Sequence, residues 1–196
     1  MRWWLRARLV LPLTCTFVVL QLVAVLVGST RIPMLNLSLG TIMAPLAVLL
    51  PCAVAVGVVS VLDRGALIER SASRPIRGLD AILAIAWAST TLATAQIAIA
   101  LGASNLSWCY ARTTVGLVGI AMALTPRFGR NIAAFVPAAF VIVASLFGVD
   151  AARQVRWWAF PLAPAASTGA AAIAAVLLGV GVAVTLFGAR RPATFA

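Results

Sequence analysis

The chain contains no histidine and no lysine, and only four of its 196 residues are acidic. Without histidine, the commonest proton shuttle near neutral pH is missing. Without lysine, the chain can neither form a Schiff base with a carbonyl substrate nor complete the GxxxxGK[ST] loop that binds ATP. These absences exclude most classes of enzyme. We therefore expect no catalytic residue, no metal site and no resident cofactor on this chain.

Cysteine is equally scarce, because the chain has only three. Cys15 and Cys52 lie inside long apolar runs, and Cys109 lies near the edge of another. The sequence has no CxxC motif and no framework of paired cysteines, so neither redox chemistry nor a disulfide scaffold is indicated. The three cysteines are expected to serve as small apolar residues.

All 15 basic residues are arginine, and together with the abundant alanine they are typical of a bacterial genome rich in G and C. The formal charge of +11 could suggest a nucleic-acid partner. The arginines are dispersed between apolar runs, however, and do not form one basic stripe, so no nucleic acid is expected. With 63% hydrophobic residues, the chain is far too apolar for an ordinary soluble domain.

The apolar runs predict an all-α, polytopic membrane protein that forms a single domain over residues 1–196. A helix needs about 20 mainly apolar residues to cross a bilayer. Six segments approach this length, at about 9–27, 41–62, 79–101, 106–126, 131–149 and 167–189. The fourth requires either arginines that snorkel towards the membrane surface or a locally thinned bilayer, because Arg112 and Arg127 leave only a short apolar stretch between them.

The distribution of arginine predicts the orientation of these segments. With six spans, one side of the membrane receives both termini and the connections after the second and fourth spans. That side would hold eleven of the arginines, and the opposite side would hold Arg31, Arg112, Arg153 and Arg156. By the positive-inside rule, both termini are expected in the cytoplasm.

The longest charged connection runs from residue 63 to 80 and contains three of the four acidic residues. Its middle could form a short surface helix, which Pro75 would prevent from continuing. The alternative is a solvated loop that merely obeys the charge rule. The residues expected to face the cytosol or a docked protein are Asp63, Arg64, Glu69, Arg70, Arg74 and Arg77.

Polar residues inside the spans are few and weakly polar. Hydrogen bonding between helices is the commoner role of such residues in membranes, and the alternative is a weakly polar lining for an amphiphilic substrate. On the third span, Trp87, Thr91 and Thr94 share one side, and Gln96 points roughly opposite. The candidates for a substrate path are Gln21, Trp87, Thr91, Thr94 and Gln96.

No span carries an acidic residue or histidine near its centre, so a self-sufficient proton-coupled carrier is not expected. The sequence also lacks the charged ring or the TVGYG-like filter of many ion channels. What remains is a transmembrane scaffold that another subunit energises.

Four stretches of the sequence resemble the permease subunits of ABC-2 type transporters. The start RWWLRAR is similar to the interfacial helix that precedes the first span in that family, and LIERSASRPIRGLDAILA is similar to its coupling-helix loop. The segment 150–164, which includes RQVRWWAFPLAP, resembles the re-entrant or interfacial region before the last span. The end AAIAAVLLGVGVAVTLFGARRP resembles the final helix of small permeases from high-GC Gram-positive bacteria.

The resemblance implies a permease in the bacterial cytoplasmic membrane that exports an amphiphile, such as an antimicrobial peptide, a drug or a lipid-linked compound, in efflux, antibiotic resistance or self-immunity. A cytosolic dimer of ABC ATPases would dock on the loop at 63–80 and would bind the ATP and magnesium. A second permease subunit, identical or different, would pair with this chain.

Two other functions stay open at this stage. One is the substrate-capturing membrane component of a vitamin importer, which also tends to have six helices. The other is an accessory membrane protein that transports nothing. Gly169, Gly179 and Gly181 on the last span would permit close helix packing in either a permease or an accessory protein.

Overall fold

The computed structural model describes residues 10–27, 30–64 and 76–187. In these ranges the chain is mostly helical, which confirms the predicted dominance of α-helix. The elements are α2 (Val10–Val27), β1 (Arg31–Asn36), β2 (Gly40–Pro45), the 3-10 helix η1 (Leu46–Val48), α3 (Leu50–Arg64), α4 (Ile76–Ala100), α5 (Leu106–Phe147) and α6 (Thr168–Phe187).

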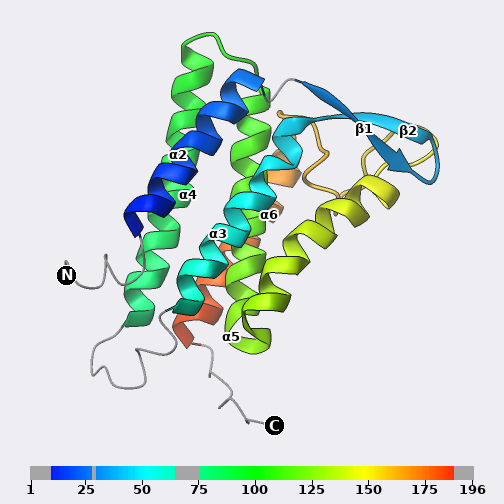
Figure 1. Cartoon of the computed structure of the whole chain (residues 1–196). Coiled ribbons are helices and arrows are strands. Elements are labelled where there is room, and N and C mark those ends of the chain that lie inside the picture. The colour runs from blue at the N-terminus through cyan, green and yellow to red at the C-terminus, as the bar shows by residue number, and fades with distance from the viewer. Residues whose placement is uncertain (1–9, 28–29, 65–75, 188–196) are drawn as a thin grey trace.

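The helices run back and forth between two ends of the molecule (Figure 1). The hairpin end carries β1 and β2, and the turn end is where α5 reverses near residue 129. Helices α2 and α4 run towards the hairpin end, whereas α3 and α6 run towards the turn end. The start of α2, the end of α3, the start of α4 and the end of α6 therefore lie together, which is the grouping that the arginine distribution predicts.

Two of the described helices are long and apolar enough to cross a membrane, namely α4 over Gly78–Ala100 and α6 over Thr168–Phe187. At a rise of about 1.5 Å per residue, each is about 30 Å long or slightly more, which matches the hydrocarbon core of a bilayer. Shorter apolar helical stretches cover Thr14–Val27, Leu46–Ser60 and Asn131–Phe147.

The spans predicted at 106–126 and 131–149 correspond to the two halves of α5. Between them, Gly129 has φ 76° and ψ −179°, and helical geometry resumes directly afterwards. This backbone conformation is essentially restricted to glycine. Pro126, one turn earlier, also weakens the helix. The chain reverses at Gly129, and the second half of α5 returns to the hairpin end (Figure 1).

The expectation of an all-α chain is wrong at the hairpin end. Strands β1 and β2 pair in antiparallel register, with Arg31 opposite Pro45 and Asn36 opposite Gly40. The span predicted at 41–62 therefore begins too early, since residues 40–45 form β2 and α3 starts at Leu50. The apolar residues of β2 extended the apolar run of α3 in the sequence and concealed the change from strand to helix.

Asn36 forms the turn of this hairpin and attaches it to α5. Its Oδ1 accepts hydrogen bonds from the N–H groups of Ser38 and Leu39, at 2.9 and 3.0 Å. Its Nδ2 donates to the carbonyl oxygen of Ser145, at 3.0 Å. Gly40 closes the turn with φ +76°. Because one buried side chain makes all three bonds, the hairpin is fixed to the end of α5.

The main core forms where α5 packs against α3 and α6. At the α5–α6 crossing, a Cβ placed on Gly181 would lie 2.4 Å from the carbonyl oxygen of Gly119. The two backbones are thus in direct contact, as small residues allow in membrane helices. The expected close packing applies to Gly181 only, because a Cβ on Gly169 or Gly179 would meet no atom within 4 Å.

Candidate functional site

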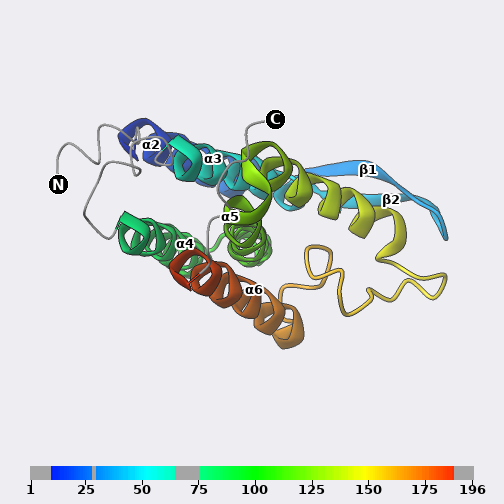
Figure 2. The same ribbon diagram turned by 90° about the horizontal axis from the view of Figure 1, so that it is seen from below.

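A groove of about 700 Å³ lies between α2 and α4, two helices that run in the same direction. Figure 2 shows α2 and α4 side by side at one edge of the molecule. The walls are mostly apolar. The residues that line the groove are Thr14, Phe17, Val18, Gln21, Leu22, Val25, Leu83, Ala86, Trp87, Thr90, Thr94, Ile97, Ala98, Leu101, Gly102 and Ala103.

An aromatic pair from the two helices lines the groove. The rings of Phe17 and Trp87 are stacked, with centroids 6.4 Å apart and planes inclined by 20°. Both side chains are buried. They also belong to a cluster with Val54 and Val58 of α3, so the pair links α2 and α4 to the core. Such an offset pair contributes about 0.5–1.5 kcal/mol beyond its buried area.

A polar contact crosses the groove one turn further along. The amide nitrogen of Gln21 donates to the carbonyl oxygen of Thr91 at 3.2 Å, and it also contacts the hydroxyl of Thr94. Because a carbonyl oxygen can only accept, this contact fixes the orientation of the amide. The hydroxyl of Thr94 can in turn donate to the carbonyl oxygen of Thr90, at 2.8 Å.

The other polar atom of Gln21 has a different environment. Its Oε1 is buried and accepts no hydrogen bond from any described residue. A buried acceptor without a partner costs about 1–3 kcal/mol. The contact between α2 and α4 thus includes both a satisfied donor and an unsatisfied acceptor on one side chain.

The structure brings together four of the five residues predicted to line a path. Gln21, Trp87 and Thr94 line the groove. Thr91 is fully buried behind it and contributes its carbonyl oxygen, while its hydroxyl donates to the carbonyl oxygen of Trp87 at 2.7 Å. Gln96 is exposed and does not line the groove. The convergence arises between two helices, and the sequence of α4 alone could not reveal it.

The charged connection predicted at 63–80 is shorter in the structure. Asp63 and Arg64 are the last residues of α3, and α4 already begins at Ile76, so that Arg77 is helical. Asp80, which the sequence placed at the edge of a span, is buried within α4. Glu69, Arg70, Arg74 and the possible surface helix lie outside the described residues. The connection leaves α3 and enters α4 at the turn end.

At the hairpin end, Arg112 occupies a position that the sequence did not predict. The expectation that Arg112 snorkels to the surface is wrong, because its side chain is only 2% exposed. Its two terminal nitrogens donate to the main-chain carbonyl oxygens of Phe160 at 3.0 Å, Ala163 at 2.6 Å and Pro164 at 2.8 Å. Carbonyl oxygens accept from both terminal nitrogens, whereas the buried Nε has no partner among the described residues. The three bonds hold the segment before α6 against α5.

The segment 150–164, expected to be re-entrant or interfacial, contains no helix and consists of turns. An isolated antiparallel bridge joins Val149 to Val155. From there the chain passes over the start of α5, where the sulfur of Cys109 lies 3.9 Å from the carbonyl oxygen of Ala163. Two features of the sequence could have indicated this arrangement. Arg112 lies within an apolar run, and the segment 150–164 contains Pro161 and Pro164, so that its carbonyl groups are not all used in a helix.

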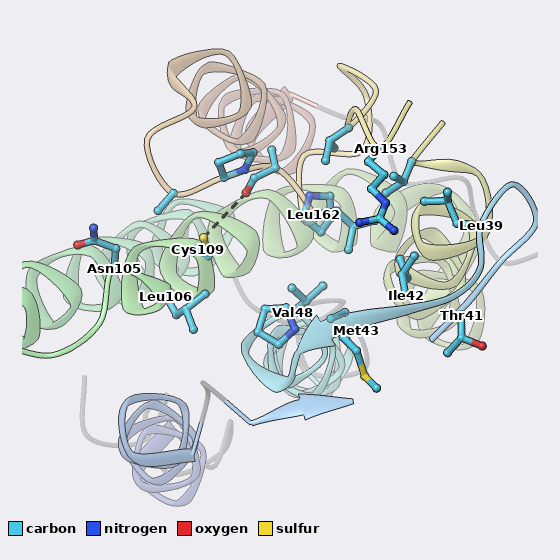
Figure 3. Close-up of a pocket in the computed structure, with 18 residues that line it drawn as sticks. Leu39, Thr41, Ile42, Met43, Val48, Asn105, Leu106, Cys109, Arg153 and Leu162 are labelled. Atoms are coloured by element: carbon cyan, nitrogen blue, oxygen red, sulfur yellow. Dashed lines mark hydrogen bonds between the residues drawn. The ribbon is translucent and has the colours of Figure 1, made fainter. Parts of the chain in front are cut away.

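A second cavity, of about 610 Å³, lies between this segment, the β-hairpin and the start of α5 (Figure 3). Its walls include Ile42 and Met43 of β2, Leu106 and Cys109 of α5, and Leu162. Among the described residues that line it, Arg153 is the only charged one. We call it the outer cavity.

Comparisons of the chain with protein-family models, with curated proteins and with solved structures found no match.

Proposed function

We propose that this chain is a multi-pass protein of the bacterial cytoplasmic membrane and the permease subunit of an ATP-driven exporter. Its substrate would be an amphiphile that passes along the α2–α4 groove. The observation that carries the proposal is the groove itself, a space of about 700 Å³ with apolar walls and one polar contact at Gln21. An ATPase dimer and a second permease subunit would complete the transporter.

The distribution of burial supports the membrane environment. Only 28% of the most apolar stretch of α4 is buried within the protein, and only 17% of the most apolar stretch of α6. A core helix of a soluble protein would be mostly buried, whereas these helices present apolar side chains to their surroundings, including Ile82, Ile97 and Val176. Exposed apolar surface on this scale indicates contact with lipid or with another protein.

The grouping of helix ends supports six crossings. Arg64, Arg77, Arg127 and Arg130 all belong to helix segments that end, begin or reverse at the turn end. Arg31, Arg112, Arg153 and Arg156 belong to the hairpin end. The described arginines divide equally, four at each end, so the excess of positive charge that the positive-inside rule requires comes from the sequence outside the described residues.

An amphiphile is the substrate class that fits the groove. An apolar chain would lie against the walls between Leu22 and Ile97, and a polar group would reach the region of Gln21 and Thr94. In a bilayer, an opening between two helices is accessible from the lipid. Neither Gln21 nor Thr94 is ionisable, so these two side chains cannot carry a coupling proton.

The position of the charged connection suggests how ATP hydrolysis reaches the groove. This connection joins α3 to α4, and α4 packs mainly on α5 whereas α2 contacts α3 and α5. A partner that pulls on the connection would tilt α4 relative to α2 and change the width of the groove. The energy for this shift must come from a difference in partner binding between the two states.

The proposal is tested by purifying the chain in mild detergent together with the ATPase that accompanies it. Charge reversal at Glu69→Arg, Arg70→Glu and Arg74→Glu is expected to remove most of the copurified ATPase and its stimulation by the chain. The matched control reverses Arg190 and Arg191, which lie beyond the last span. Normal assembly and turnover of the triple variant would reject the coupling role.

The groove is tested in the same preparation with octadecyl rhodamine as the transported probe. Ala86→Trp should fill the groove and lower transport by about tenfold, equivalent to about 1.4 kcal/mol of lost binding, while leaving the ATPase attached. Gln96→Trp, on an exposed position outside the groove, is the control. Equal transport by both variants would reject the groove as the path, and uptake in place of export would favour the importer.

A further inference from the structure

The outer cavity is lined by one exposed cation, Arg153, which forms no ion pair with a described residue. Arg153 lies in a tight turn in which the N–H of Asp150 donates to the carbonyl oxygen of Gln154 at 3.1 Å, and the N–H of Arg153 donates to that of Asp150 at 3.0 Å. Arg153 itself has φ 59°, so the turn holds it in the left-handed conformation. Figure 3 shows its side chain extending towards Ile42 of β2.

The nearest acidic side chain along the chain is already engaged. A carboxylate oxygen of Asp150 accepts a hydrogen bond from the N–H of Gln154, at 2.9 Å. Within the described ranges, the Arg153 guanidinium makes no ion pair, and no acidic residue lines the cavity. The cavity therefore combines apolar walls with one unneutralised positive charge.

The surroundings of the cavity are those of a membrane surface. Large apolar side chains at the hairpin end are strongly exposed, including Leu35 and Met43 of the hairpin and Trp157, which is 80% exposed. Tryptophan is enriched where lipid head groups meet water, and exposed leucines would be costly in water alone. With six crossings, the hairpin end lies at the outer surface, and the cavity opens near the lipid head groups.

We propose that the outer cavity binds one anionic phospholipid, with an acyl chain against Ile42, Leu106 and Leu162 and the phosphate group on Arg153. A net negative head group is favoured because no described wall residue offers a carboxylate to the ammonium group of a zwitterionic lipid. The inference rests on the proposed membrane placement, but not on ATP-driven transport or on the α2–α4 groove.

The test is native mass spectrometry of the full chain in detergent, with dioleoyl phosphatidylglycerol and dioleoyl phosphatidylcholine added separately. The wild type is expected to retain one phosphatidylglycerol. Arg153→Gln should weaken this binding by about fivefold, the effect of about 1 kcal/mol for one cation near a lipid surface. Arg156→Gln is the matched control, since Arg156 is exposed three residues away and does not line the cavity.

Two further variants separate a lost charge from a damaged turn. Arg153→Gly removes the charge but suits the positive φ, so it should keep the fold and still lose the lipid. Leu106→Trp should fill the cavity and lower the binding of the acyl chain. The proposal is overturned if Arg153→Gln and Arg153→Gly retain the lipid as the wild type does, or if Arg156→Gln loses it equally. Equal binding of phosphatidylcholine, or displacement of the lipid by excess inorganic phosphate, would also overturn it.

Discussion

Gly181→Ala is expected to disrupt the packing of α5 against α6. The added Cβ would lie 2.4 Å from the carbonyl oxygen of Gly119 and 3.0 Å from its Cα. These are main-chain atoms, so no flexible side chain can move aside and the helices must separate. Overpacking of this kind costs about 1–3 kcal/mol. For a chain of this size the midpoint of thermal unfolding should fall by about 2–4 °C for each kcal/mol.

The measurement is the thermal midpoint of the purified chain in detergent, followed by size-exclusion chromatography of the heated sample. Gly179→Ala provides the control, because it lies on the same helix and its Cβ would meet no atom within 4 Å. That variant should be as stable as the wild type or slightly more stable, since alanine favours a helix. The packing described for α5 and α6 is incorrect if both variants unfold at the same temperature.

Arg112→Met is expected to release the segment before α6 from α5. The substitution keeps an apolar stem of similar length but removes the donors to the carbonyl oxygens of Phe160, Ala163 and Pro164. Hydrogen bonds to a charged group contribute about 1.5–3 kcal/mol each, so the loss should open this segment even if the helices stay packed. The buried thiol of Cys109, which lies under Ala163, should then become accessible.

The reactivity of Cys109 towards a maleimide measures this opening in a chain that also carries Cys15→Ser and Cys52→Ala. Labelling of Arg112→Met should be at least about tenfold faster, corresponding to about 1.4 kcal/mol less protection. Arg156→Met, on the same segment but exposed, should leave the rate unchanged. Arg112→Lys should open partly, because one ammonium cannot contact three carbonyl groups in the geometry of a guanidinium. An unreactive Cys109 in Arg112→Met would contradict the role assigned to Arg112.

Helix positions follow closely from the length of each apolar run. The expected segments 9–27, 79–101 and 167–189 differ from α2, α4 and α6 by three residues or fewer at each end. This agreement has a simple cause, since each helix largely coincides with one apolar run, and α4 extends its run by about one turn through Arg77 and Gly78. The same reasoning failed at 41–62, because strand β2 is as apolar as the helix that follows it.

The α2–α4 groove could be predicted only in part. The polar residues Gln21, Thr91 and Thr94 are conspicuous in apolar helices, and the sequence identified all three. Their convergence depends on the register of α2 against α4, which local periodicity does not determine. Arg112 was expected to snorkel because Arg112 and Arg127 leave only a short apolar stretch between them, whereas its side chain is buried and contacts carbonyl groups.

Both the proposed permease function and the proposed lipid site require the two ends of this bundle to lie on opposite sides of a membrane. We expect a single cysteine at Ser38→Cys, on the exposed hairpin, to react with a membrane-impermeant maleimide in intact cells. Phe128→Cys, at the exposed turn end, should react only after the membrane is permeabilised. Both variants are made in a chain whose three natural cysteines have been replaced. Labelling of both positions in intact cells, or recovery of the chain in the soluble fraction, would contradict the account.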